Sequence, residues 1–339
     1  MFIILLSIIG GIISLGIGAE MIVRSSVNLA NIYKVSGYFI GFTVVALGTS
    51  LPELAATIQA LSVVDSMEIA LGNIIGSNIA NILLILGVVS ILQPIIFSEK
   101  KGQKNQTIMV LLITIIAAVI FYIVTNIPSS NPVIFGIILI AIFVFFLFFQ
   151  YKMELDFKNE ETFSAKYSQI FSYILLLIGL IFLYYGSKYF ILGSNELAIY
   201  FQVPESIIGL TLVAFGTSLP ELATGVVAAL RRQSNIAVGT ILGSNIYNIV
   251  GIFALILFLK PEGLPANSSI LFTNIILMTL VTLLFVITIG DFYVSVKEHK
   301  PVDEGVINLL KMSITGIVGI VAGYVSRTKC PGHDDKDDD

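Results

Sequence analysis

The stretch IGFTVVALGTSLPELA at residues 40–55 returns as IGLTLVAFGTSLPELA at residues 208–223, with identity at 13 of 16 positions. A second pair follows, because GNIIGSNIAN at 72–81 matches GTILGSNIYN at 239–248. Two linked motifs that recur at an almost constant offset indicate an internal duplication. Each half of the chain therefore carries the same two motifs on consecutive helices.

The composition around these motifs is that of a membrane protein. Of 339 residues, 56% are hydrophobic and 12% are charged, and the mean hydropathy is +0.97. A transmembrane helix needs about 20 apolar residues to cross about 30 Å of hydrocarbon, and such stretches follow one another along the chain. A water-soluble globule is excluded. We expect an all-α, multi-pass protein of the cell membrane, with the lipid bilayer as a partner and no nucleic acid.

Short polar breaks divide the apolar stretches into ten predicted transmembrane helices. Their ranges are 2–30, 37–64, 67–92, 105–126, 132–151, 168–200, 205–230, 235–259, 268–290 and 304–325. Residues 1–151 form the first five-helix repeat, 152–167 a linker, 168–327 the second repeat and 328–339 a disordered acidic tail.

Five helices per half is an odd number, so the second copy enters the membrane upside down relative to the first. The loop between the two motifs carries Asp65 and Glu68 in copy one but Arg231 and Arg232 in copy two, as expected for loops on opposite sides. Inverted-topology repeats around a midplane site are the architecture of alternating-access transporters. A duplicated structural bundle without transport is the alternative.

Basic residues mark the cytoplasmic side of a membrane protein. One predicted face carries most of them: Lys34, the cluster at 100–104, Lys152, Lys158, Lys166, Arg231, Arg232, Lys297 and Lys300. The other face has Lys260, with Arg327, Lys329 and Lys336 of the tail counting against the assignment. Both termini are therefore predicted outside and the 152–167 loop in the cytoplasm.

The GTSLPE motif, residues 48–53 and 216–221, contains a proline that breaks the helix. Pro52 and Pro220 have no N–H to give to the carbonyl four residues earlier, so carbonyls at mid-membrane become free to bind a cation. On a helix, spacings of three, four and seven residues put the oxygens of each motif on one face. The companion motifs GSNIAN at 76–81 and GSNIYN at 243–248 add a serine and an asparagine one turn apart.

These oxygens are hard donors, which suit Na⁺ and Ca²⁺ better than zinc or copper. The candidate metal ligands are Ala46, Thr49, Ser50, Glu53, Ser77, Asn81, Ala214, Thr217, Ser218, Glu221, Ser244 and Asn248.

Glu53 and Glu221 are the most informative single residues. A charged side chain near the bilayer centre costs about 2.5–3.5 kcal/mol on insertion scales, which indicates a function. Two facing carboxylates would neutralise one divalent or two monovalent cations, so the two kinds of ion would compete. The alternative is that each glutamate is protonated or hydrogen-bonded and has a structural role only.

The paired G-T-S-L-P-E and G-S-N-I-x-N motifs resemble the alpha repeats of the cation/calcium exchanger superfamily, in its sodium/calcium exchanger branch. The resemblance covers the whole membrane core and implies ten helices, with helices 2, 3, 7 and 8 in a central bundle and helices 1 and 6 sliding across it. It implies ligation through the backbone at Ala46 and Ala214 and through side chains at the ten other candidates. It also implies antiport, in which Ca²⁺ moves in exchange for Na⁺.

Two positions depart from the family pattern. Thr240 stands where copy one has Asn73, which we expect to affect helix packing more than ligation. Asn248 stands where similar proteins carry Asp, and the potassium-dependent branch typically does, so the site keeps two carboxylates and obligatory K⁺ transport is not expected. The short 152–167 loop lacks the large regulatory domains of animal exchangers, so the chain resembles a prokaryotic transport core.

Helices 1 and 6 are rich in glycine. The residues are Gly10, Gly11, Gly16 and Gly18 in the first and Gly179, Gly186 and Gly193 in the second. They either offer little resistance to sliding or simply pack tightly.

Other functions remain open at this stage. A calcium/proton or other cation/proton exchanger is the nearest alternative, although that branch usually shows a G-N-x-x-E pattern. A cation channel would want a continuous pore, usually from an oligomer, whereas this chain has one inverted pair of motifs and is expected to work as a monomer. No nucleophile with a base, H-E-x-x-H pattern or phosphate loop is visible, so neither an enzyme nor a cofactor is expected.

Overall fold

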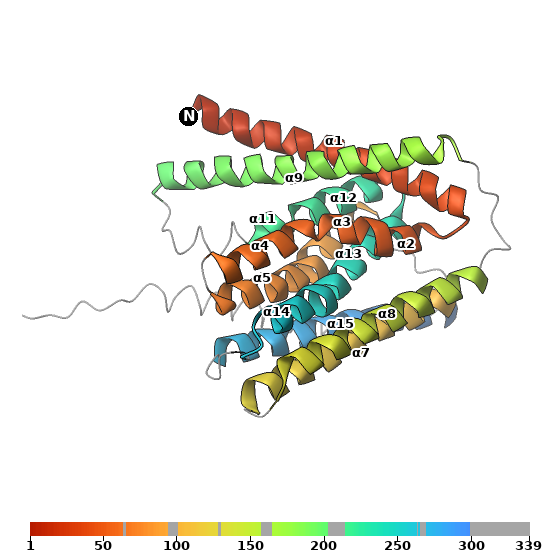
Figure 1. The fold of residues 1–339 in the computed structure, drawn as a ribbon. Helices are drawn as coiled ribbons and strands as arrows, with labels where there is room; N and C mark the ends of the chain where they lie inside the picture. The colour runs from red at the N-terminus through yellow and green to blue at the C-terminus, as the bar shows by residue number, and fades with distance from the viewer. Residues whose placement is uncertain are drawn as a thin grey trace, which may run out of the picture. The chain divides into compact units, whose positions relative to one another are not determined.

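The computed structural model describes residues 1–63, 66–93, 101–127, 130–156, 165–202, 214–262, 264 and 269–298. All regular elements in these ranges are helices (Figure 1). Met1–Thr282 and Leu283–Asp339 are two separate units, and the packing described below is that of the first.

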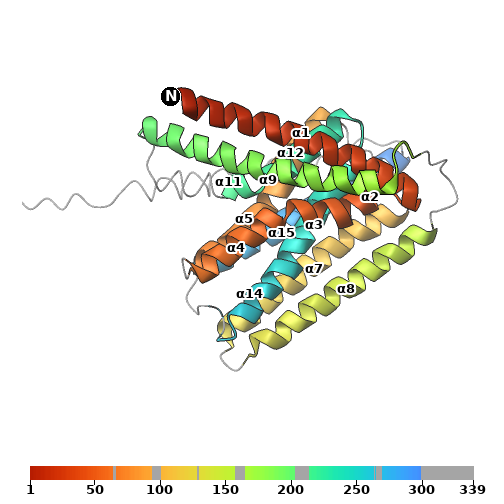
Figure 2. The ribbon, with the colours of Figure 1, turned by 45° about the horizontal axis from the view of Figure 1, so that its top comes forward.

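Two long helices, α1 (Phe2–Tyr33) and α9 (Gln169–Tyr200), pack along their whole length (Figures 1 and 2). Gly11 of α1 lies against Gly186 of α9, and Gly18 lies against Gly179. Residue numbers increase along α1 while those of the contacting residues in α9 decrease, so the two helices run antiparallel. With 32 residues each, they are about 48 Å long, which exceeds the hydrocarbon thickness of about 30 Å.

Five glycines of these helices lie in the contact between α1 and α9. A Cβ added to Gly18 would lie 2.7 Å from the Gly179 carbonyl oxygen, and one added to Gly11 would lie 2.8 Å from the Gly186 carbonyl oxygen. Gly193 likewise faces Ile4 and Ile8 of α1. These five glycines therefore allow α1 and α9 to pack tightly against each other. They do not line the surface on which the pair meets the other helices.

Gly10 and Gly16 are exposed, and a Cβ there would meet no described atom within 4 Å. They point away from the helix pair and take no part in either role expected for them.

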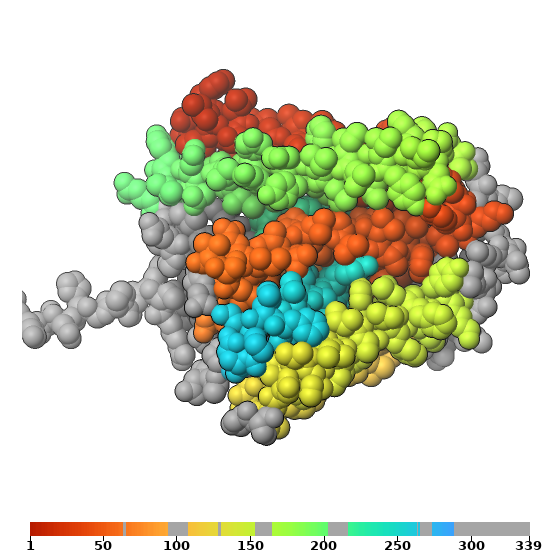
Figure 3. Space-filling model, viewed as in Figure 1, coloured from red at the N-terminus to blue at the C-terminus, as the bar shows by residue number. Residues whose placement is uncertain are grey.

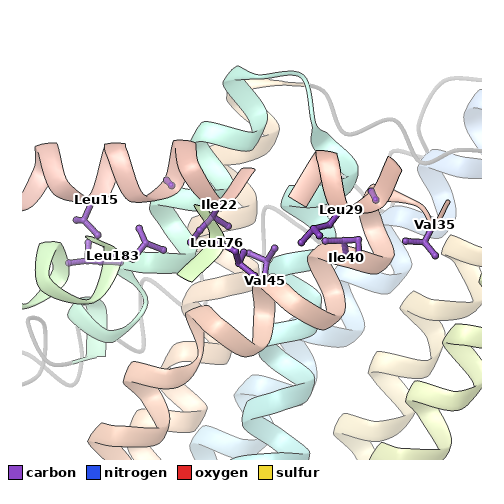
Figure 4. Packing of buried hydrophobic residues seen from close by; sticks show 11 residues of the cluster. Leu15, Ile22, Leu29, Val35, Ile40, Val45, Leu176 and Leu183 are labelled. Carbon is purple, nitrogen blue, oxygen red and sulfur yellow. The ribbon is translucent and has the colours of Figure 1, made fainter. Parts of the chain in front are cut away.

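An apolar layer joins the α1–α9 pair to the second span (Figure 4). It includes Leu15, Ile22, Leu29, Leu176 and Leu183 of the long helices and Ile40 and Val45 of the second span. The outward sides of the long helices are also apolar, with Phe2, Ile9 and Ile170 more than half exposed. Figure 3 shows the pair as a continuous ridge above the motif helices, and such an apolar exterior fits lipid contact.

The motif helices lie between this pair and the outer helices, and each is interrupted. The second span consists of α2 (Gly37–Ile40), the π-helix η1 (Gly41–Val45), α3 (Ala46–Thr49) and α4 (Leu51–Ser62). The third consists of α5 (Met67–Ala80), η2 (Asn81–Ile85) and α6 (Leu86–Leu92). In copy two, the elements are α11 (Ala214–Thr217), α12 (Leu219–Leu230), α13 (Ser234–Ile246), η4 (Tyr247–Ile252) and α14 (Phe253–Leu259).

The π-helical segments begin at or next to predicted ligands. η2 starts at Asn81, η4 starts one residue before Asn248, and η1 ends one residue before Ala46. A π-turn shifts the register of the following helix and is often found at functional sites. The interruptions therefore mark the same region that the sequence motifs mark.

Two further helices, α7 (Lys101–Asn126) and α8 (Pro132–Asp156), cover the side of the motif helices opposite to α1 and α9 (Figures 1 and 2). α8 continues into the segment predicted as the 152–167 linker, so the connection is shorter than expected. The last described helix is α15 (Ser269–Glu298).

The predicted spans overlap the described helices, but α8 and α15 continue past the predicted ends at residues 151 and 290, to Asp156 and Glu298. Seven described helices are long and apolar enough to cross a membrane, and Leu219–Leu230 and Thr273–Ile287 are shorter apolar helices. The predicted seventh helix is described only from Ala214 onward. The predicted helix at 304–325 and the tail at 328–339 lie outside the described residues, so the count of ten stays a prediction.

Candidate functional site

Both GTSLPE motifs break their helices at the same place. α3 gives way to α4 at Ser50 and α11 gives way to α12 at Ser218, with φ/ψ of −82°/1° and −86°/5°. The proline that follows lies in the first turn of the new helix, where its missing N–H is not needed. Glu53 and Glu221 consequently stand in the first turns of α4 and α12.

The carbonyl of Ala46, which the family resemblance implies as a ligand, is not free in the structure. It accepts the Ser50 N–H at 3.0 Å and the Thr49 hydroxyl at 3.3 Å. The break falls after this residue, so the turn that contains Ala46 keeps its hydrogen bond. Ligation through the Ala46 carbonyl would require one of these donors to move, since a carbonyl oxygen has two lone pairs.

The two glutamates are both fully buried, with 0% of their surface exposed. Glu53 Oε1 accepts a hydrogen bond from Ser218 Oγ at 3.4 Å, and Glu221 Oε1 accepts one from Ser244 Oγ at 3.2 Å. Among the described residues, Oε2 of each glutamate has no hydrogen-bond partner. Each carboxylate is therefore held at one oxygen and left unpaired at the other.

Hydroxyl groups connect the two copies in a crossed pattern. Thr49 Oγ1 of copy one lies 3.4 Å from Ser244 Oγ of copy two, and Ser77 Oγ of copy one lies 3.4 Å from Thr217 Oγ1 of copy two. These two pairs occupy equivalent positions in the duplicated motifs. Hydroxyl groups of the two copies thus meet beside the two glutamates.

The companion motifs contribute two predicted asparagines, which are hydrogen-bonded across the two copies. Asn81 and Asn248 are fully buried, and each donates its side-chain amide to another asparagine, Asn245 or Asn78, at 2.9 and 3.0 Å. Within the described residues, neither Oδ1 atom has a hydrogen-bond partner. The amide groups therefore present free oxygens, as the carboxylates do.

Three buried asparagines in contact with the candidates were missed from the sequence. Asn73 accepts a hydrogen bond from Thr217 Oγ1 at 3.2 Å and donates to the Glu53 carbonyl at 3.1 Å. Asn78 and Asn245 hold Asn248 and Asn81. Asn78 and Asn245 recur in both copies of the GSN motif, and a polar residue repeated inside a membrane span is a signal that could have found them.

Nine of the predicted ligands have side-chain hydrogen bonds between the two copies or to a glutamate. Seven of them are in the contacts around the glutamates: Thr49, Glu53, Ser77, Thr217, Ser218, Glu221 and Ser244. The other two, Asn81 and Asn248, are in the asparagine contacts. Ser50 is buried at the break with an unpaired Oγ. Ala214 is described only as the first residue of α11. Their action as ligands stays a prediction.

The oxygen atoms of the predicted ligands are of the type that a hard cation prefers. Five of the buried atoms that have no hydrogen-bond partner in the described part of the chain belong to predicted ligands: Glu53 Oε2, Glu221 Oε2, Asn81 Oδ1, Asn248 Oδ1 and Ser50 Oγ. Leaving buried polar groups unpaired is costly, and a cation with oxygen ligands would satisfy them. The described residues contain no cluster of three or more His, Cys, Asp or Glu side chains.

A family model described as sodium/calcium exchanger protein matches residues 3–152 and 171–325, which is most of the chain. The chain belongs to this family. Relatives cover the same region: an uncharacterized membrane protein of Methanocaldococcus jannaschii is 37% identical over 81% of this chain and 87% of its own length. Sodium/calcium exchanger MaX1 of Methanosarcina acetivorans is 33% identical over 82% and 89%.

The fold of this exchanger-family protein is also found in solved structures. It is similar to the sodium-calcium exchanger NCX_Mj soaked with 100 mM Na⁺ and 10 mM Sr²⁺, with a TM-score of 0.74 and 31% identity. The likeness covers 94% of this chain and 98% of that one. The expected family is confirmed, and with it a multi-pass membrane protein of a transporter family.

Proposed function

We propose that this protein is an antiporter that moves Ca²⁺ across the cell membrane in exchange for Na⁺, at one site shared by the two motif copies. The observation that carries the proposal is the pair of buried carboxylates, each with one oxygen that has no hydrogen-bond partner among the described residues. Asn81 and Asn248 of the companion motifs add two buried amide oxygens in the same state. One Ca²⁺ or two Na⁺ would neutralise Glu53 and Glu221. Competition between the two ions then follows from charge alone.

The predicted ligands act together in this proposal. Calcium takes six to eight oxygen ligands at about 2.3–2.6 Å, and the motifs supply carboxylate, amide and hydroxyl oxygens in that number. The carbonyls of Ala46 and Ala214 would complete the set only after local rearrangement. Ca²⁺ and Na⁺ are the transported ions, and no cofactor is part of the mechanism.

Ten helices in two inverted repeats provide the proposed framework. Two observations support it: the antiparallel run of α1 and α9, which are the first helices of the two copies, and the crossed hydrogen bonds between equivalent hydroxyls. In this framework residues 1–151 and 168–327 are the repeats.

We place both termini outside and the segment between α8 and α9 in the cytoplasm. Lys166 of that segment and Arg231 of the turn after α12 line one cavity of about 420 Å³ together with Arg24. Their common location supports the assignment of these basic loops to one face, and basic loops face the cytoplasm.

Alternating access needs one part that moves and one that holds the ions. The α1–α9 pair is joined by glycine contacts along its length, so it would move as a single body over the motif helices. The ions would stay with α4, α5, α12 and α13. One chain contains both parts, which supports function as a monomer.

The empty site explains why exchange is coupled. Without a bound ion, two carboxylates in an apolar environment carry a penalty of several kcal/mol, and moving the α1–α9 pair over them would expose them to an apolar constriction. One Ca²⁺ or two Na⁺ removes that penalty. The carrier then crosses in either direction only when it is loaded.

The test is Ca²⁺ uptake by proteoliposomes of purified protein driven by an outward Na⁺ gradient. We expect saturable uptake that stops when the Na⁺ gradient is removed. Uptake driven by a proton gradient without Na⁺ would indicate a cation/proton exchanger, and flux without any counter-ion would indicate a channel.

A second arm of the same experiment concerns potassium. Because residue 248 is an asparagine, the site has two carboxylates and no charge left for K⁺ beside Ca²⁺. We expect exchange at an unchanged rate when K⁺ is replaced by choline on both sides. A strict requirement for K⁺ on the Ca²⁺ side would contradict the two-carboxylate site.

A further inference from the structure

Four buried asparagines form a closed network across the two copies. Asn78 and Asn81 come from copy one, Asn245 and Asn248 come from copy two, and none is more than 1% exposed. Asn81 Nδ2 donates to Asn245 Oδ1 at 2.9 Å, and Asn248 Nδ2 donates to Asn78 Oδ1 at 3.0 Å. The two bonds are equivalent under the duplication, so each copy holds an asparagine of the other.

Backbone carbonyls determine which way the amides point. Asn78 Nδ2 donates to the Asn245 carbonyl at 3.3 Å, and Asn245 Nδ2 donates to the Asn78 carbonyl at 3.4 Å. Only the NH₂ end of an amide can donate to a carbonyl oxygen. The Oδ1 atoms of Asn78 and Asn245 must therefore face the other way, toward Asn248 and Asn81.

This orientation passes to the candidate ligands. An Oδ1 atom can pair only with a donor, so Asn81 and Asn248 turn their NH₂ groups toward the bracing asparagines. Their own Oδ1 atoms then have no partner among the described residues. Oxygens, which bind cations, are left unpaired, and the NH₂ groups, which repel cations, are taken up by the network.

We propose that Asn78 and Asn245 are positioning residues, which orient the amides of Asn248 and Asn81 so that both present oxygen to the transported ion. This inference rests on the proposed cation site. It assigns a role to two residues of the GSN motif that are not themselves ligands. A backbone carbonyl fixes the amide orientation of each bracing asparagine, and the bracing asparagine then fixes the amide orientation of the ligand.

The network also explains why residue 248 is neutral. An ionised aspartate there would place a carboxylate oxygen against Asn78 Oδ1, two acceptors at about the 3.0 Å now bridged by a hydrogen bond. Asn78 would have to turn its amide around and lose its bond to the Asn245 carbonyl. Residue 248 therefore cannot be an ionised aspartate while Asn78 keeps its present amide orientation.

The test is a double-mutant cycle on the KM for Ca²⁺ in Na⁺-driven uptake. Asn78→Leu keeps the side-chain size and removes the brace of Asn248. We expect it to raise this KM about tenfold, as is typical when a group that orients a metal ligand is lost. In an Asn248→Ala background the same substitution should change the KM less than twofold, because its target is gone.

The matched control uses the other ligand. Asn78 does not brace Asn81, so Asn78→Leu should keep its tenfold effect in an Asn81→Ala background. The mirror cycle, Asn245→Leu with Asn81→Ala, should show the same coupling and is used if Asn78→Leu does not fold. The proposal would be overturned if Asn78→Leu changed the KM for Ca²⁺ equally in the Asn248→Ala and Asn81→Ala backgrounds. A substitution that acts only through lost packing has the same effect whichever ligand is present.

The cycle does not depend on the transport assay alone. Ca²⁺-dependent stabilisation of the detergent-solubilised protein against heat gives the same comparison through binding. If wild-type protein binds Ca²⁺ but shows no Na⁺-driven uptake, the proposed exchange is wrong and the positioning role is still tested by the binding cycle. If wild-type protein shows neither Ca²⁺ binding nor uptake, both proposals fail.

Discussion

The two motif copies place their glutamates alike but support them differently. Glu53 and Glu221 are equally buried and each keeps one unpaired oxygen. Behind Glu53, however, Asn73 donates to the Glu53 carbonyl and to Thr57 Oγ1, at 3.1 and 3.3 Å. Its counterpart in copy two is Thr240, whose hydroxyl turns back to the Ile236 carbonyl of its own helix at 2.9 Å. In copy one this position bonds to the helix that contains the glutamate, whereas in copy two it bonds within its own helix.

This difference shows how a duplicated site becomes unequal. Asn73 also accepts the Thr217 hydroxyl, whereas the equivalent Thr49 hydroxyl donates to the carbonyl of Ala46 in its own helix. The Asn-to-Thr difference was expected to affect packing more than ligation. In the structure, Asn73 contacts both a candidate ligand and the backbone of a candidate glutamate, and the effect of the difference on ligation stays a prediction.

The largest effect should come from removing either charge. Glu53→Gln and Glu221→Gln should each lower Na⁺-driven Ca²⁺ uptake about 100-fold or more, since breaking a buried charge arrangement costs about 3–5 kcal/mol. The exposed Glu68 at the start of α5 provides the control, and Glu68→Gln should transport normally. Near-normal uptake by either Gln variant, measured in protein with an unchanged melting temperature, would rule out a shared site.

The next largest effect concerns the α1–α9 contact. Gly18→Leu should lower the free energy of unfolding by about 1–3 kcal/mol, the usual cost of overpacking, because its Cβ alone would lie 2.7 Å from the Gly179 carbonyl oxygen. Gly16→Leu is the matched control, two residues away on the exposed side. Melting temperatures in detergent measure both. Equal destabilisation by the two substitutions would mean that α1 has a different rotation about its axis.

Sequence reasoning could find the breaks, the glutamates and the repeated polar positions because they depend on local chemistry. A proline after Ser50 interrupts a helix in any surroundings, and a carboxylate in an apolar span indicates function. The rotation of α1 could not be predicted in this way. Residues 2–19 of that helix are apolar except for Ser7 and Ser14, so this stretch has no charged face to distinguish buried Gly18 from exposed Gly16.

The asparagine contacts were beyond sequence reasoning for a different reason. The repeat shows that Asn78 and Asn245 are equivalent, but their bonds cross between helices about 165 residues apart in the chain. Which amide end donates depends on a backbone carbonyl of the opposite copy. The state of the Ala46 carbonyl likewise depends on whether the helix breaks before or after Ser50, a difference of one residue that motif spacing does not resolve.

Exchanging the residues at the unequal position tests the comparison directly. Asn73→Thr removes the hydrogen bonds to the Glu53 carbonyl and Thr217, each worth about 1 kcal/mol, so the KM for Ca²⁺ should rise about tenfold. Thr240→Asn places the same side chain in copy two and should leave the KM within about twofold, because Glu221 is already positioned without it. A larger effect of Thr240→Asn would mean that copy two depends more on this position than copy one.

The smallest effect concerns the interior of α1, where the two copies differ in an ion pair. Glu20 contacts Arg231 of the turn after α12 at 2.5 Å and Arg24 of its own helix at 2.5 Å, which ties α1 to a motif helix. The equivalent residue of α9 is Lys188, and it forms no ion pair with any described residue. Partly exposed ion pairs are worth about 0.2–1 kcal/mol and are screened by salt. Glu20→Gln should therefore lower the melting temperature by a few degrees at low salt and by less at high salt, and Lys188→Gln should leave it unchanged at both. If Lys188→Gln lowers the melting temperature more than Glu20→Gln does, an ion pair of α9, and not the ion pair of α1, attaches the α1–α9 pair to the motif helices.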